Sequence, residues 1–305
     1  MKRYILKRIL LGLLTLIGVT IVVFVAVRLS GDVTLLLAPP DATQAEIDKL
    51  RAELGLDKSI PMQYIVFIKN LTKGDFGRSF RYNRPAMQLV LSRLPATMEL
   101  AILAFCVLVT LGMVFGVTSV MKPGSWLDRC GTVFALLGQA MPEFWIGIMA
   151  ILIFSVGLHW FPTSGRGGLS HLILPSLTLG WYSAASIMRL TRSSMLEVMG
   201  SEFVKMARLK GNPERVVVWK HALRNALIPV VSMGGLQLGR LLGGAVIVET
   251  VFGWPGLGQL IVDAVYTRDY SVVQAGVMVT SIIFITLNLV VDLLYGGIDP
   301  RIRYE

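Results

Sequence analysis

The chain has 305 residues, of which 54% are hydrophobic and only 16% are charged, and this composition excludes a soluble globular protein. The formal net charge of +10 is explained below by membrane topology, so no nucleic-acid partner is expected. Cys106 and Cys130 fall in or beside apolar runs, and no Cys or His cluster has metal-site spacing. We expect an integral membrane protein, in contact with the lipid bilayer, with no metal site and no disulfide.

Six runs are long enough to cross the roughly 30 Å of hydrocarbon in a bilayer, which takes about 20 residues each. The first run is longer than the apolar part of a signal peptide and no small-residue cleavage site follows it, so we expect it to be retained. The predicted fold class is an all-α integral membrane protein with six transmembrane helices, near Ile9–Val27, Ala96–Val120, Thr132–Leu158, Leu172–Met188, Leu227–Val248 and Val272–Leu294.

Basic residues gather on one side of these predicted spans. That side has 16 of the 29 basic residues but only six of the 19 acidic ones, so it carries the whole net charge. The positive-inside rule makes it the cytoplasmic side, with both chain termini there. The predicted organisation is a cytoplasmic tip and first span in 1–30, an extracytoplasmic insert in 31–95, a transmembrane core in 96–294 and a cytoplasmic tail in 295–305.

The predicted insert contains two helices. Thr43 and Glu46 have capping-box spacing, and Gly55 is placed to end the helix that they open. Residues 60–71 predict a second, amphipathic helix lying against the membrane surface.

Two charged residues fall inside predicted spans, where an unpaired charge is costly. Glu143 follows Pro142 near the middle of the third span, and Arg240 lies among glycines in the fifth. One hypothesis is that both face the translocation path, with Arg240 paired to Glu143 at rest and to a substrate carboxylate in transit. The alternatives are a Glu143 hydrogen-bonded to a neighbouring helix and an Arg240 in a permanent structural pair, including a pair with an acid of a partner subunit.

The loop between the fourth and fifth spans, 201–229, is long and strongly charged, so we expect it in the cytoplasm. It predicts two short helices around a corner at Gly211, with Asn212 capping the second helix and Pro213 at its first position. Ala207 and Gly211 are four residues apart and would present a small surface that another backbone can approach. A basic loop that merely holds anionic lipid is the alternative.

Several segments resemble one known family. Ala207, Gly211, Ile228 and Pro229 resemble the EAA loop of ABC importer permeases, which docks on the ATPase subunit, although Lys205 and Met206 stand where that pattern begins Glu-Ala. Together, AR-x-KG and KHALRNALIP are similar to the peptide and nickel branch. In the insert, LLAPPDAT, LGLDKSIPMQY, GDFGRSF and RLPATMELA resemble the B-type dipeptide, oligopeptide, glutathione and nickel permeases.

This resemblance implies a multi-pass subunit of the bacterial inner membrane. Its implied partners are a second, homologous permease, two ATPase subunits and an extracytoplasmic solute-binding protein. ATP and Mg would bind the ATPase subunits, and this chain would bind no cofactor. Ala207, Arg208 and Gly211 would lie at the ATPase docking surface.

Three classes of function compete. An enzyme would need a nucleophile and base or a metal motif, and an ATPase would need a Gly-x-x-x-x-Gly-Lys loop; neither is found, so no catalytic residue is expected. A channel would not need a rigid cytoplasmic corner. We expect a transport subunit that carries small peptides, with nickel or a nickel chelate as the alternative cargo and oligosaccharides or opines left open.

Overall fold

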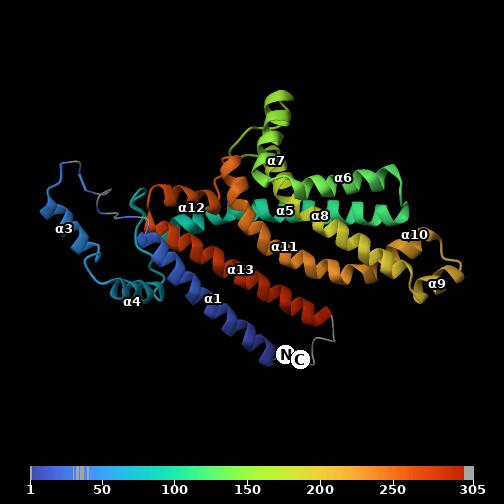
Figure 1. Cartoon of the computed structure of the whole chain (residues 1–305), viewed down its shortest axis with the longest axis horizontal. Coiled ribbons are helices and arrows are strands. Elements are labelled where there is room, and N and C mark those ends of the chain that lie inside the picture. The colour runs from blue at the N-terminus through green and yellow to red at the C-terminus, as the bar shows by residue number, and fades with distance from the viewer. Residues whose placement is uncertain (1, 30, 32–33, 35–37, 40, 299–305) are drawn as a thin grey trace. The chain divides into compact units, whose positions relative to one another are not determined.

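The computed structural model describes residues 2–29, 31, 34, 38, 39 and 41–298 (Figure 1). Residues 299–305 of the predicted tail lie outside this part of the chain. The regular elements within it are helical, apart from an isolated bridge between Arg78 and Pro85. In chain order they are α1 (Lys2–Leu29), α3 (Gln44–Glu53), α4 (Ile60–Leu71), α5 (Ala86–Met121), α6 (Trp126–Ala140), α7 (Glu143–Ala150), η1 (Ile151–Gly157), α8 (Leu169–Met199), α9 (Glu202–Leu209), α10 (Glu214–Val216), η2 (Val217–Ala222), α11 (Leu223–Val251), α12 (Leu257–Tyr266) and α13 (Tyr270–Ile298).

The chain divides into two compact units, of which unit 1 comprises residues 1–95 and 256–285. The capping box predicted before α3 is confirmed: Thr43 accepts from the Glu46 amide, and Glu46 accepts from the Thr43 amide at 2.8 Å. The predicted end of this helix is also confirmed, because Gly55 follows α3 with a φ of +66°. The start of α13 is fixed to the insert through buried Asp269, which accepts a hydrogen bond from the Ser79 hydroxyl.

Unit 2 comprises residues 96–255 and 286–305 and is built around α8. In it α8 packs against α6, α7 and α11. Its contact with α5 is also close, since a Cβ at Gly112 would lie 2.6 Å from the Ile187 side chain. Phe134 of α6 stacks on Trp181 of α8 with ring centroids 4.9 Å apart, and the indole N–H donates to the Phe134 carbonyl. Small residues and stacked rings thus bring the helices of this unit together.

Four helical stretches of the described chain are long and apolar enough to cross a membrane: Ile5–Leu29, Ala86–Met121, Glu214–Val251 and Tyr270–Leu293. A fifth is obtained if α6 and the helix formed by α7 and η1 count as one bent span. The predicted fourth span lies in α8, which is long but less apolar, because serines, two threonines, His171 and three charged residues lower its hydropathy. Many of those hydroxyl residues are buried in unit 2, which is why a span-like helix can carry them.

The third span predicted at Thr132–Leu158 is wrong as a single helix. The chain leaves α6 at Met141 in an extended conformation, and α7 begins at Glu143 with Pro142 before it. The chain bends by 113° between α6 and the helix formed by α7 and η1. Figure 1 shows α7 turning away from the direction of α6. Proline has no amide hydrogen to donate to the helical hydrogen bonds, and it disfavours helical geometry in the preceding residue. The break therefore falls at Met141 and Pro142.

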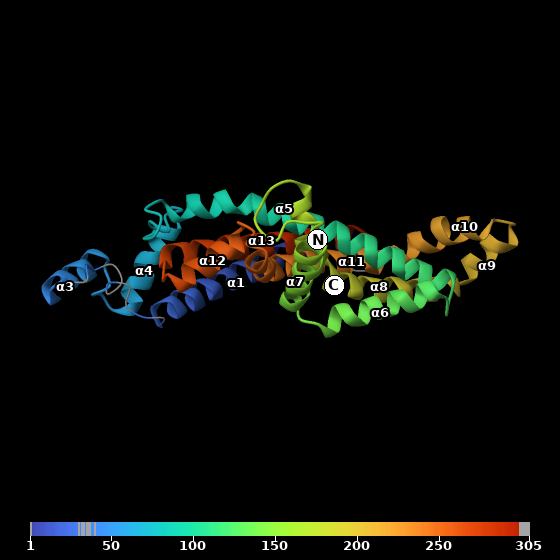
Figure 2. The ribbon, with the colours of Figure 1, turned by 90° about the horizontal axis from the view of Figure 1, so that it is seen from above.

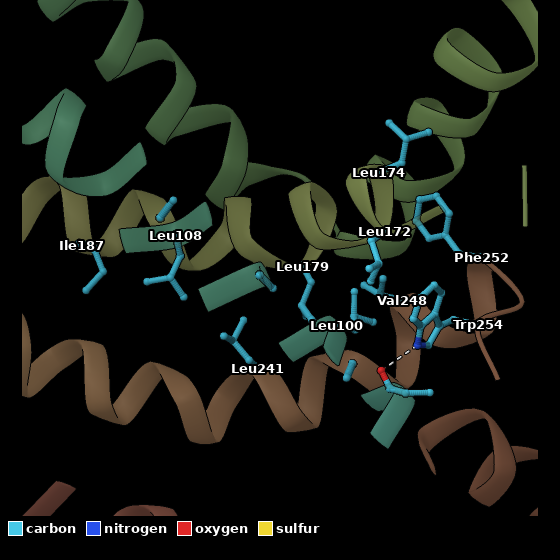
Figure 3. Close-up of a cluster of buried hydrophobic side chains, with 14 of the residues drawn as sticks. Leu100, Leu108, Leu172, Leu174, Leu179, Ile187, Leu241, Val248, Phe252 and Trp254 are labelled. Carbon is cyan, nitrogen blue, oxygen red and sulfur yellow. Dashed lines mark hydrogen bonds between the residues drawn. The ribbon is translucent and has the colours of Figure 1, made fainter. Parts of the chain in front are cut away.

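The core of unit 2 ends at a buried tryptophan (Figure 3). Trp254 is 0% exposed, packs beside Phe252 and Val248, and donates its indole N–H to the Ala96 carbonyl at 2.9 Å. The glycine-rich turn after α11 is therefore fixed to the α5 backbone at this end.

We expect Trp254→Phe to lower the free energy of unfolding by about 1 kcal/mol, because the ring still fills most of the site but the hydrogen bond is lost. Thermal unfolding in detergent measures this change. Exposed Trp160 is the matched control, and Trp160→Phe should leave the melting temperature unchanged.

Candidate functional site

The predicted corner of the cytoplasmic loop is formed by α9, Gly211 and α10, which lie together at one end of unit 2 (Figure 2). Gly211 has a φ of +79°, is exposed, and has open space where a side chain would begin. The first of the two predicted helices is α9. The second is not a separate short helix, because α10 continues through η2 into α11 as one stretch from Glu214 to Val251.

The predicted roles of Asn212 and Pro213 are wrong. Pro213 itself precedes α10 as its extended N-cap residue, and the side-chain amide of Asn212 donates to the Ala207 carbonyl at 2.9 Å. Asn212 therefore satisfies a carbonyl at the end of α9, where four backbone acceptors lack helical partners. Asn212 thus caps the C-terminal end of α9 instead of the N-terminal end of α10.

An ion pair spans the corner. The Arg208 guanidinium binds the Glu214 carboxylate through two hydrogen bonds, Nε to Oε2 at 3.2 Å and Nη2 to Oε1 at 2.7 Å. These bonds raise the pKa of Arg208 above its ordinary value. Two hydrogen bonds fix both the distance and the angle between the guanidinium and the carboxylate. The pair therefore holds the end of α9 against the start of α10. Sequence reasoning missed it, although the spacing of an arginine and a glutamate across a glycine was visible.

The three residues predicted at the docking surface occupy different environments. Arg208 and Gly211 are exposed, whereas Ala207 is 7% exposed and packs with Val204 in a core that also contains residues of η2. Ala207 thus packs α9 against η2. The exposed apolar side chains of α9 are Phe203, Met206 and Leu209.

Exchanging the charges of the Arg208–Glu214 pair tests its role. We expect Arg208→Glu alone to reduce coupling between ATP turnover and transport several-fold, because it breaks the ion pair that holds α9 against α10. The double variant Arg208→Glu with Glu214→Arg should restore coupling, because the reversed charges can form the same pair. Transport and ATP hydrolysis measured on the same reconstituted complex give the coupling ratio. A double variant no better than the single one would show that Arg208 acts by touching the ATPase.

The charged residues Glu143 and Arg240 lie near each other in unit 2. Glu143 opens α7, and its carboxylate lies over α11, where a Cβ at Gly244 would be 3.1 Å from Oε2. Arg240 is one turn earlier in α11 and exposed, with its guanidinium 5.2 Å from the centre of the Tyr182 ring of α8. The ion pairs of the described residues do not include one between Glu143 and Arg240.

The tertiary structure adds Tyr182 to this cluster. A guanidinium near an aromatic face is attracted by the ring electrons, which orients it without neutralising it. Nothing in the sequence placed α8 beside Arg240, so this contact was missed. The Arg240 guanidinium is thus exposed and lies beside the Tyr182 ring.

Comparison with known proteins identifies the family of the chain. Residues 108–304 match the family described as binding-protein-dependent transport system inner membrane component, and residues 1–101 match the family of its N-terminal membrane component. Two relatives are permease proteins GsiC of glutathione transport systems, from Salmonella typhimurium strain LT2 with 46% identity and from Escherichia coli strain K12 with 45%. Both alignments cover 100% of this chain and of the relative.

The fold is shared with solved ABC transporters. An inward-facing structure of the MetNI methionine ABC transporter matches with a TM-score of 0.58 at 20% identity, covering 70% of this chain and 97% of that one. An amino acid ABC transporter with histidines matches with a TM-score of 0.53 at 14% identity, covering 68% of this chain and 93% of that one. These matches confirm the predicted helical permease fold, whereas the family match and the GsiC relatives confirm the prediction of a transport subunit. The chain therefore belongs to the family of inner membrane components of binding-protein-dependent transport systems.

Proposed function

We propose that this permease carries small peptides of the glutathione and dipeptide kind across the inner membrane. The observation that carries the proposal is the full-length 46% identity to permeases of glutathione transport systems. The cluster of Glu143, Tyr182 and Arg240 supports it, because an exposed guanidinium within a transmembrane helix suits a cargo with carboxylates. It does not suit a free divalent metal ion, which the same charge repels.

We propose an assembly of four further subunits around the chain: a second permease, two ATPase subunits and an extracytoplasmic binding protein. The family depends on a binding protein, and the chain has no phosphate-binding loop of its own. In this proposal both termini lie in the cytoplasm, α8 completes a set of six spans, and 31–95 faces outward.

The proposed coupling element is the corner of α9, Gly211 and α10. It is exposed at Arg208 and Gly211, braced by Glu214, and continuous with α11, which also carries Arg240. Movement of the ATPase subunits at the corner would therefore act on the helix that bears the cargo-facing charge. This is coupling through a rigid element with two arrangements.

Uptake by the reconstituted complex tests the cargo. Proteoliposomes containing the permeases, ATPase subunits and cognate binding protein should accumulate radiolabelled glutathione or a dipeptide on ATP addition. Nickel ions, tested in parallel, should not accumulate. Uptake of nickel without uptake of either peptide would refute the proposed cargo and leave the family assignment intact.

A further inference from the structure

Unit 1 contains a pocket that is separate from the corner at Gly211 and from the cluster of Glu143, Tyr182 and Arg240. Its volume is about 230 Å³, and it lies between the C-terminal end of α1, the α3–α4 connection, α4, residues 75–77 and the start of α13. Its polar lining residues are Arg28, Lys58, Gln63, Asn70, Asp75 and Ser271.

Aromatic packing fixes α4 along α1. Phe24 of α1 is 1% exposed, and its ring lies 5.3 Å from that of Tyr64 and 5.7 Å from that of Phe67. The hydroxyls of Thr20 and Tyr64 are hydrogen-bonded at 2.8 Å. Thr20, Phe24 and Arg28 are spaced four residues apart, so they lie on one face of α1. This face contacts α4 at Thr20 and Phe24 and lines the pocket at Arg28.

The contact places α4 below the end of a membrane span. The apolar stretch of α1 runs from Ile5 to Leu29, and Thr20 precedes Leu29 by nine residues, which is roughly 13 Å of helix. Half of the hydrocarbon thickness is about 15 Å. A helix that contacts α1 between Thr20 and Phe24 is therefore at the depth of acyl chains, and Arg28 is near the depth of headgroups.

The surface of α4 agrees with this depth. Ile60, Met62 and Ile65 are 58%, 48% and 59% exposed, although they are large and apolar. Such a surface is unfavourable in water and favourable against acyl chains. It adjoins the pocket, since α4 also supplies Gln63 and Asn70 to the lining.

The charges of the pocket select an anion. Arg28 and Lys58 are cationic, and the guanidinium of Arg28 is held 5.1 Å from the Phe24 ring and 5.8 Å from the Tyr270 ring. One oxygen of Asp75 accepts from the Gly77 amide at 2.8 Å, and this carboxylate keeps its negative charge. With Arg28, Lys58 and Asp75 the formal charge of the lining is +1, which favours an anion. The Gln63 side-chain amide already donates to the Leu56 and Lys58 carbonyls, at 3.2 Å and 2.7 Å. A phosphodiester would therefore meet the two cations and the side-chain amide of Asn70.

We propose that this pocket binds the phosphate of a phospholipid headgroup, whose acyl chains cover the apolar residues of α4. The lipid thereby holds the insert against the membrane surface. Free phosphate has the same anionic chemistry but brings no acyl chains, so the two sources are separable by experiment.

Native mass spectrometry of the full chain, titrated with phosphatidylglycerol, tests the proposal. Lys58→Ala should weaken binding of one lipid about tenfold, because a bond to a charged group is lost, while Lys58→Arg should retain it. Lys69→Ala is the matched control: it removes an exposed lysine from the same region, outside the pocket, and should bind lipid like the unchanged chain.

Three results would overturn the proposal. The first is equal lipid binding by the Lys58→Ala and Lys69→Ala variants. The second is displacement of the lipid by inorganic phosphate at equal concentration, which would make the pocket a free-anion site. The third is unchanged lipid binding by Lys58→Ala together with weaker docking of the binding protein, which would assign the pocket to that protein.

Discussion

Replacing Gly211 with aspartate is expected to separate ATP hydrolysis from transport. The corner is exposed and its φ is +79°, a conformation that aspartate adopts more readily than most residues, so α9 and α10 should stay folded. The substitution adds a side chain and a negative charge where a second subunit is proposed to dock. We expect the amount of cargo transported per ATP hydrolysed to fall by about 5- to 150-fold, which is the range that typical coupling free energies between two sites produce.

The measurement is the ratio of cargo accumulated to phosphate released by reconstituted complexes. Gly74→Asp is the matched control, because Gly74 is also exposed, has a φ of +73° and has open space around it, but lies in the insert. Normal coupling in Gly211→Asp, or an equal loss in Gly74→Asp, would contradict the proposed role of the corner.

Replacing Arg240 with alanine is expected to reduce uptake of carboxylate-bearing cargo by about tenfold or more. A hydrogen bond from a guanidinium to a carboxylate contributes about 1.5–3 kcal/mol, and alanine removes it together with the charge. Helix α11 should remain intact, because Arg240 is exposed and alanine favours helix. Uptake at equal amounts of assembled complex is the quantity to measure.

An amidated peptide distinguishes recognition from structural damage. If Arg240 binds the carboxylate, the unchanged complex should carry the amide poorly and Arg240→Ala should lower amide uptake no further. Tyr182→Phe keeps the ring beside the guanidinium and should transport normally. Full transport of the free acid by Arg240→Ala would remove Arg240 from the path.

Apolar length and local signals predicted much of the fold correctly. The span predicted at Ile9–Val27 lies within α1, and the cap at Thr43 and the turn at Gly55 are where the sequence placed them. Such features depend on neighbouring residues alone, so they can be predicted without knowledge of the fold. The span through Pro142 failed because hydropathy averages over a window and does not register the break that proline makes.

The sequence by itself determined that the chain lies in a membrane, that its loop turns at Gly211, and that Glu143 and Arg240 are charges in apolar surroundings. Only the tertiary structure decided what these residues touch. It buried Ala207, bonded Arg208 to Glu214, and brought Tyr182 to Arg240 from another helix. The reason is physical: periodicity and composition fix which residues are helical and apolar, whereas side-chain partners depend on how helices distant in sequence pack together.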